Sequence, residues 1–178
     1  DWSWSRGLGD VYKRQADTLV FEIPPAEMSS PKNIGLIQRS AIYTDGTTLK
    51  DHLSPKTHAR LQKLIKAKSI PIVPQMRPWL VTQMIAMQEF TKRGFGPQFG
   101  VDMHYEAKGS KAGKKIEGLE TVEFQLNLFT SVPDKEQENL LVQTLDDVGD
   151  AEVFLNRMIT AWRTGDAKGL SGGLNEAM

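Results

Sequence analysis

The chain has 178 residues, of which 39% are hydrophobic and 25% charged, the composition of one globular domain of ordinary size. Its 22 Lys and Arg balance 22 Asp and Glu, so no net charge attracts it to an anionic polymer, and we expect no nucleic-acid partner. Because the chain has no cysteine, disulfides, thiolate metal sites and cysteine nucleophiles are excluded. No window approaches the roughly 18 apolar residues of a membrane span, so we expect no transmembrane segment.

The first stretch, DWSWSRGLGDVYKRQ, has neither the apolar segment of a signal peptide nor the period of a strand or an amphipathic helix. It resembles the adapter-derived translation seen at the edges of assembled sequence fragments. We therefore expect a non-native leader over residues 1–15 and a partial domain over residues 16–178.

The N-terminal half begins with a β-rich run from Thr18 to Ile23, which predicts a buried strand ended by two prolines. The SSP sequence at 29–31 and TDGTT at 44–48 indicate turns. Ser54 followed by proline is typical of a helix N-cap and first helical residue, and a second helix is expected after Pro78. The expected inner faces of these two helices are Leu61, Leu64 and Ile65, and then Leu80, Met84, Met87 and Phe90.

The C-terminal half is predicted to be mostly helical. We expect a helix over 101–112, a short strand around Ile116, a helix capped by Thr121, and another after Pro133. The apolar residues of these last two helices are Val122, Leu126 and Phe129, and then Leu140, Leu141, Leu145 and Val148. The final predicted helix ends at Gly165 and has a continuous apolar stripe of Ala151, Phe154, Leu155, Met158, Ile159 and Trp162.

This order predicts a predominantly helical α/β fold, with a few short strands forming part of a central sheet flanked by helices. A lone pair of strands is marginal in water. We therefore expect further sheet partners, either outside these residues or from irregular segments.

Histidines give little support for a metal site. The spacing of His52 and His58 does not direct two imidazoles at one ion, so both are interpreted as surface residues. His104 stands near Asp102 and Glu106, where a shared metal is conceivable, although these residues are too close in sequence for one helical face.

Other motifs have ordinary structural interpretations. GFGPQFG at 94–100 lacks the spacing of a dinucleotide loop and is interpreted as a connector. The lysines at 63–68 and 111–115 lack interleaved aromatic residues and are interpreted as solvated faces. Helical spacing predicts core packing for Trp79, Met84, Met87, Phe154, Met158 and Trp162.

Two carboxylates stand apart. Glu22 interrupts the apolar strand TLVFEI, and Glu120 ends the short KKIEGLE run just before a predicted helix. The carboxyl end of a strand in an open α/β sheet is where ligands collect, which makes Glu22 a candidate site acid. Glu120 is a second candidate, at the start of a helix whose N-terminal amides stabilise negative charge. The alternative interpretation is a strand-end surface residue for Glu22 and a first-turn helix charge for Glu120.

The segment GLETVEFQLNLF, residues 118–129, resembles the GLET-x-x-x-Q-x-x-x-F signature of the TraB/GumN family, which is related to the Tiki proteins. ADTLVFEI, RPWLVTQM, the FGVDMHYEAKGSKAGKKIEGLET segment and AWRTGD resemble other parts of the same family. The resemblance extends from Ala16 to about residue 170.

Membership would imply an α/β fold and a metal-dependent peptidase or hydrolase activity, centred on two G-x-x-H motifs and acidic residues. By position, Glu22 and Glu120 correspond to the catalytic acids, with Glu22 also the metal ligand. No G-x-x-H occurs in this chain, so the resemblance implies an internal fragment. We expect a divalent metal ion in the full-length protein, none in the fragment, and no catalysis by the fragment alone.

The leading hypothesis is therefore a fragment of a metal-dependent peptidase-like hydrolase that acts on a peptide or protein. The alternative is a non-catalytic binding module associated with the cell envelope. The resemblance also implies a bacterial periplasmic or envelope location, while the substrate, the metal and the oligomeric state are not determined by the sequence.

Overall fold

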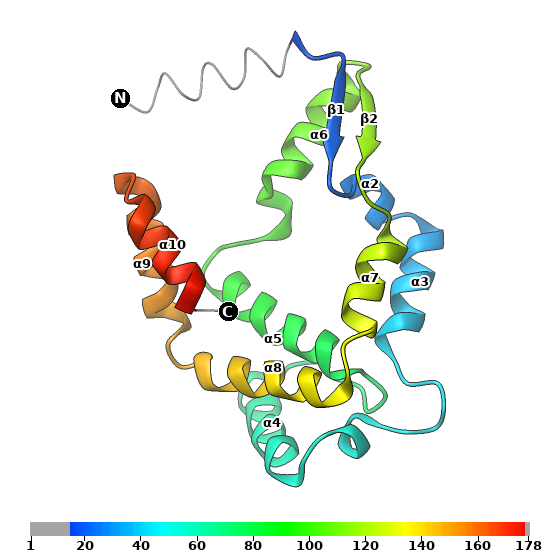
Figure 1. The fold of residues 1–178 in the computed structure, drawn as a ribbon, viewed down its shortest axis with the longest axis vertical. Coiled ribbons are helices and arrows are strands. Elements are labelled where there is room, and N and C mark those ends of the chain that lie inside the picture. Colours follow the sequence, from blue (N-terminus) through cyan, green and yellow to red (C-terminus); the bar gives the residue numbers. More distant parts are fainter. Residues whose placement is uncertain (1–14, 177–178) are drawn as a thin grey trace.

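The computed structural model describes residues 15–176, with side chains described for all of these except residue 151 and residues 172–176. This part of the chain is a predominantly helical α/β protein, as predicted (Figure 1). The expected leader, residues 1–15, lies outside the described residues except for its last one. None of the described helices combines the length and the apolar run that a membrane crossing requires.

The strands are β1 (Thr18–Phe21) and β2 (Lys115–Gly118). The helices, in chain order, are α2 (Pro25–Met28), α3 (Pro31–Ala41), the 3-10 helix η1 (Leu49–His52), α4 (Pro55–Lys68), α5 (Pro78–Lys92), the 3-10 helix η2 (Pro97–Phe99), α6 (Val101–Lys111), α7 (Val122–Thr130), α8 (Asp134–Asp147), α9 (Ala151–Thr164) and α10 (Ala167–Glu176).

The sheet is a parallel pair in which Thr18 faces Lys115 and Phe21 faces Gly118. Helix α6 lies alongside it at one end of the molecule (Figure 1). The close approach depends on Gly109, because a Cβ there would lie 2.4 Å from Leu19 Cδ1. One face of the short sheet is thus covered by a helix that immediately precedes β2.

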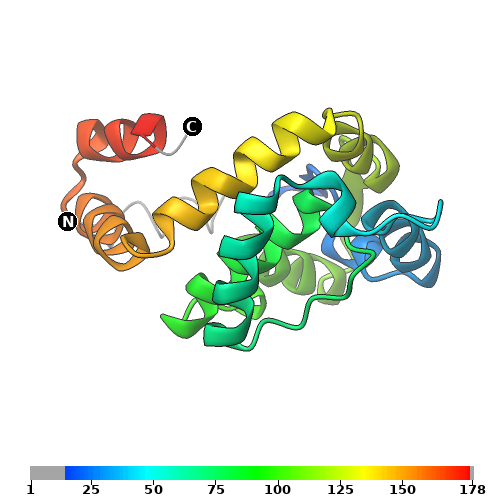
Figure 2. The ribbon, with the colours of Figure 1, turned by 90° about the horizontal axis from the view of Figure 1, so that it is seen from below.

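The larger apolar core lies away from the sheet, among η1, α4, α5 and α8. Helix α8 lies along α5, as both views show (Figures 1 and 2). Helix α4 begins as predicted, because the Ser54 hydroxyl accepts a hydrogen bond of 3.2 Å from the Thr57 N–H. The buried residues of this core are Leu49, Leu53, Leu61, Ile70, Val81, Ile85 and Leu141.

A smaller core joins α3, α5 and α7. Its buried members are Ala41, Trp79, Val122 and Leu126. The Trp79 ring stacks on Phe129 with 5.3 Å between centroids, which fixes the end of α7 against the start of α5. Since Trp79 is on α5, the same helix contributes to both cores.

The C-terminal helices α9 and α10 form a pair at one end of the molecule (Figure 2). Helix α9 ends as predicted at Gly165, whose φ of 74° is the left-handed conformation that glycine adopts without steric cost. Helix α10 follows directly, although its weak apolar pattern did not predict a helix.

Three predictions about elements are wrong. The first strand ends at Phe21, two residues early, because the chain turns into α2 at two prolines. Helix α3 was not predicted: Ser30 and Pro31, interpreted as a turn, are its N-cap and first residue. Trp162 was expected in the core, but it is 64% exposed.

The buried face of α5 also differs from the expectation. The expected Met87 and Phe90 are exposed, and Leu80 and Met84 are only half-buried. The buried face instead contains Pro78, Trp79, Val81, Ile85 and Glu89. The helix packs against α8 and also carries Trp79 in the smaller core, so its apolar residues do not define one face.

Candidate acidic site at the sheet end

The structure brings the two predicted acidic residues together through their backbones. Beyond the last paired residues of the sheet, the Leu119 N–H donates to the Phe21 carbonyl at 2.8 Å and the Glu120 N–H donates to the Glu22 carbonyl at 2.9 Å. Glu22 and Glu120 therefore lie side by side at the carboxyl end of the parallel pair. This is the edge of an α/β sheet where ligands usually bind.

Glu120 is oriented by its neighbours in the chain. Its Oε2 accepts a hydrogen bond of 3.2 Å from the Gln125 side-chain amide, one turn into α7. Thr121 begins that helix as predicted, since its hydroxyl accepts from the Phe124 N–H at 3.1 Å. The half-buried Glu120 carboxylate is thus held beside the N-terminus of α7, where the helix dipole favours negative charge.

The chain must also turn tightly between Glu22 and α2. A Cβ at Gly118 would lie 2.9 Å from Pro24 Cδ and 3.2 Å from the Glu120 carbonyl oxygen, so only glycine fits there without displacement. The first, fourth, eighth and last positions of the GLET-x-x-x-Q-x-x-x-F segment therefore each have a structural role. They are Gly118, Thr121, Gln125 and Phe129.

The Glu22 side chain is exposed, on the solvent side of the strand end. The strand's side chains alternate, with Phe21 buried and Val20 exposed, so Glu22 shares the outer face with Val20. A carboxylate in this position is accessible to a ligand or to a metal ion from solvent.

A third carboxylate lies near this edge but is already engaged. Glu106 of α6 accepts from the Ala26 N–H with both oxygens, at 3.1 and 3.0 Å, and so caps α2. His104 is exposed and its ring meets Tyr105 edge-on, with centroids 5.2 Å apart. The metal alternative for His104 with Asp102 and Glu106 finds no support here.

The donor set within residues 15–176 does not fit a hydrolytic metal ion. Such an ion usually takes about three protein ligands and keeps a position for water. Nowhere in the described part do three His, Cys, Asp or Glu side chains gather at metal-binding distances. Glu22 and Glu120 alone are two carboxylate ligands, fewer than the three that such an ion usually takes.

A polar cluster that the sequence did not predict surrounds His52. Its Nδ1 lies 2.5 Å from Asp134 Oδ2, its Nε2 lies 2.8 Å from Thr47 Oγ1, and its ring stacks on Tyr43 with centroids 3.8 Å apart. The Arg77 guanidinium lies 4.5 Å from the centroid of the Tyr43 ring. His52 is therefore a half-buried connector between η1 and α8, and its interpretation as a surface residue was wrong.

The Thr47, His52 and Asp134 chain has the connectivity of an acyl-transfer triad, but its surroundings are those of a structural cluster. Thr47 Oγ1 also lies 2.6 Å from Asp45 Oδ1, and the Thr47 amide donates to that same carboxylate at 3.0 Å. The Thr48 amide donates to Asp51 at 2.8 Å. These adjacent amides are therefore occupied and cannot serve as oxyanion donors.

Burial, followed by the charge of Asp134, raises the pKa of Tyr43 in this cluster to about 12. The phenol is thus neutral throughout the physiological range. It contributes a packed ring to the cluster, and it does not act as an acid at neutral pH.

Together, the fold and the strand ends define a mostly helical α/β protein with a pair of glutamates at the carboxyl edge of a parallel strand pair. The chain belongs to the TraB/PrgY/gumN family, whose model matches residues 2–178. Comparisons with curated proteins and with solved structures gave no match.

Proposed function

We propose that this chain is the acid-bearing part of a metal-dependent peptidase or related hydrolase, with Glu22 as metal ligand or general base and Glu120 as a site-shaping acid. The observation that supports the proposal is the backbone junction, in which the Glu120 N–H donates to the Glu22 carbonyl at 2.9 Å. It sets both carboxylates at one edge of the sheet, and family membership supplies the expectation of hydrolysis.

The described residues place no third metal-binding side chain beside Glu22 and Glu120. In this proposal, histidine ligands therefore come from outside the described residues. In this proposal the chain is incomplete as a catalyst: it holds the acidic groups in place and needs imidazole-bearing segments to complete the site. A peptide or protein is the proposed substrate, and the bacterial periplasm or envelope the proposed location.

Glu120 has a defined part in the proposal. The Gln125 amide holds one carboxylate oxygen, which fixes the plane of the group and reduces the entropy lost when a ligand binds. Glu22 is exposed, so a water molecule or an ion can reach its carboxylate from solvent.

The test uses the complete reading frame that encodes this chain, expressed and assayed on fluorogenic peptides with added Mn²⁺, Co²⁺ or Zn²⁺. Substitution of either glutamate by glutamine should lower kcat by roughly 10²-fold or more, as expected for a general base or ligand. Glu123→Gln, at an exposed position in the first turn of α7, is the matched control and should leave kcat unchanged. A reading frame without any G-x-x-H segment, or Glu22→Gln and Glu120→Gln variants with full activity, would contradict the proposal.

The alternative is a non-catalytic binding module of the envelope, and the lack of a three-ligand group among residues 15–176 favours it. The effect of metal ions on thermal stability distinguishes the hydrolase from the binding module. A protein that binds its ion gains roughly 2.7 kcal/mol at a ligand concentration of 100 Kd, so its Tm rises with the ion. If the Tm of the complete protein does not change with any of the three ions, and the protein cleaves no peptide, the binding module is supported.

A further inference from the structure

A cavity of about 390 Å³ lies where the C-terminal ends of α5 and α8 meet the start of α9. Its volume is within the roughly 300–1,000 Å³ typical of small-molecule sites. It shares no lining residue with the strand ends that carry Glu22 and Glu120. The site is therefore separate from the proposed hydrolytic one.

The walls of this cavity are mostly apolar and partly aromatic. Phe90 of α5 and Phe154 of α9 both line it, with Val148 and the buried Leu155 between the helices. Val153 is 70% exposed and remains open to solvent. Aromatic rings in such a wall offer the π-faces on which organic cations bind.

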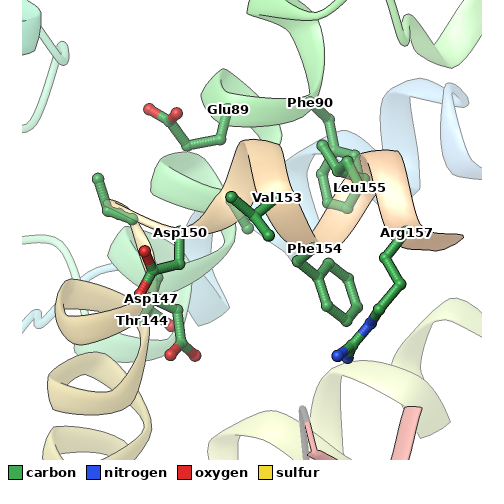
Figure 3. A pocket seen from close by; sticks show the side chains of 11 residues that line it. Glu89, Phe90, Thr144, Asp147, Asp150, Val153, Phe154, Leu155 and Arg157 are labelled. Atoms are coloured by element: carbon green, nitrogen blue, oxygen red, sulfur yellow. The ribbon is translucent and has the colours of Figure 1, made fainter. Parts of the chain in front are cut away.

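Two aspartates occupy one side of the cavity, opposite the phenylalanines (Figure 3). Asp147 is the last residue of α8, and no basic residue lies in that last turn, so its charge is set against the helix dipole. Asp150 directly precedes α9, yet its side chain makes no capping hydrogen bond. The position of Asp150 at the start of α9 favours its charge. Both aspartates are exposed, and neither forms an ion pair with another described side chain.

The other charged groups of the cavity do not neutralise the aspartates. Glu89 is buried and bonded to Lys68 and Arg93, so it is already compensated. Arg157 lies on the side of the cavity away from Asp147 and Asp150 (Figure 3). Two exposed carboxylates without an ion-pair partner among the described side chains therefore face an aromatic wall across a space of small-molecule size.

We propose that this cavity binds a small organic cation, an ammonium group attached to an aromatic or branched alkyl body. The ammonium group lies beside Asp147 and Asp150, and the apolar body lies against Phe90 and Phe154. A bare metal ion does not match this site, because no three ligating side chains gather here among the described residues.

The test is an NMR titration of the ¹⁵N-labelled 178-residue chain with phenethylammonium, and with 2-phenylethanol as its neutral near-isostere. A ligand of this size should bind with a Kd on the order of 1 mM. The shifts should concentrate in residues 147–157. The alcohol should bind at least about fivefold more weakly, since it keeps the apolar contacts and loses the charge.

The double variant Asp147→Asn, Asp150→Asn should weaken phenethylammonium about tenfold. Asparagine is a good residue at both helix ends, so this variant should fold like the parent chain. Asp146→Asn is the matched control: it removes a neighbouring charge on α8 that is bonded to Arg60 of α4 at 2.5 Å, and it should leave the affinity within about twofold.

Three results would overturn the proposal. They are equal affinity for the amine and the alcohol, an equal loss of affinity in Asp146→Asn and the double variant, and no saturable shift below about 50 mM ligand.

Discussion

Glu138 is the buried carboxylate whose removal should change stability in the most specific way. It is 6% exposed on α8, and its Oε1 accepts the Ser54 N–H at 2.9 Å, so it ties α8 to the N-terminus of α4. Hydrogen bonds from the side chains of Ser54 and Thr57 are the main cause that lowers its pKa from 4.5 to about 2. The ionised form is thus the one that the folded protein stabilises.

The magnitude follows from the two pKa values. The difference between 4.5 and about 2 corresponds to about 3 kcal/mol of unfolding free energy. Because the folded pKa is the lower one, this contribution is complete above the unfolded pKa and is lost as the pH falls through the folded value. Between pH 7 and pH 3, about 2 kcal/mol of it should disappear.

Glu138→Gln isolates this contribution. Glu89, Asp45 and Asp51 also have lowered pKa values, so the parent protein loses stability in acid for several reasons at once. Subtracting the unfolding free energy of the variant from that of the parent cancels these shared contributions. We expect Glu138→Gln to be about 2–3 kcal/mol less stable at pH 7, with the gap narrowing by about 2 kcal/mol at pH 3.

Urea unfolding followed by tryptophan fluorescence at the two pH values measures the gap. Glu136→Gln, an exposed position on the same helix, is the control and should change stability by less than about 0.5 kcal/mol at either pH. A Glu138→Gln gap of the same size at pH 7 and pH 3 would refute the assignment of the lowered pKa to this carboxylate.

Three further predictions concern packing and titration. Because the pKa of Tyr43 is raised to about 12, its neutral phenol stabilises the folded protein fully below pH 10. About 2–3 kcal/mol of this stability should be lost as the pH rises to 12, and titration of the phenolate absorbance at ~295 nm measures the midpoint. Gly109→Val should cost about 2–3 kcal/mol in chemical unfolding by forcing α6 off the sheet, whereas Ser110→Val on the exposed side should cost under about 1 kcal/mol. Phe129→Ala should cost about 1–2 kcal/mol and change the emission of Trp79, and an unchanged spectrum would contradict the stacking.

Local sequence signals predicted the elements with clear ends. Ser54 and Pro55 begin α4, Thr121 begins α7 and Gly165 ends α9, because each of these residues satisfies or terminates the helix by its own chemistry. The same Ser–Pro signal at residue 30 was interpreted as a turn. The helix that follows has Ile34, Ile37 and Ala41 at helical spacing, so its apolar pattern, like its cap, could have predicted it.

The candidate site was predicted in part, because the signals at the ends of its strand and helix are also local. The sequence placed Glu22 at the end of a strand and Glu120 at the start of a helix, and the structure has both residues there, but it did not predict the parallel pairing that brings them to one edge. The contact between Gln125 and Glu120 is local and could have been inferred from the start of α7. The partners of His52 could not, since Asp134 is 82 residues away and the contact depends on how α8 lies across η1.

Because α5 contributes Val81 and Ile85 to the larger core and Trp79 to the smaller one, neither cluster can open without disturbing that helix. Amide hydrogens in the middle of α5 should therefore exchange with deuterium only when the whole domain unfolds, and more slowly than those of α9 and α10. The two clusters then melt as one cooperative unit, although they share no buried side chain.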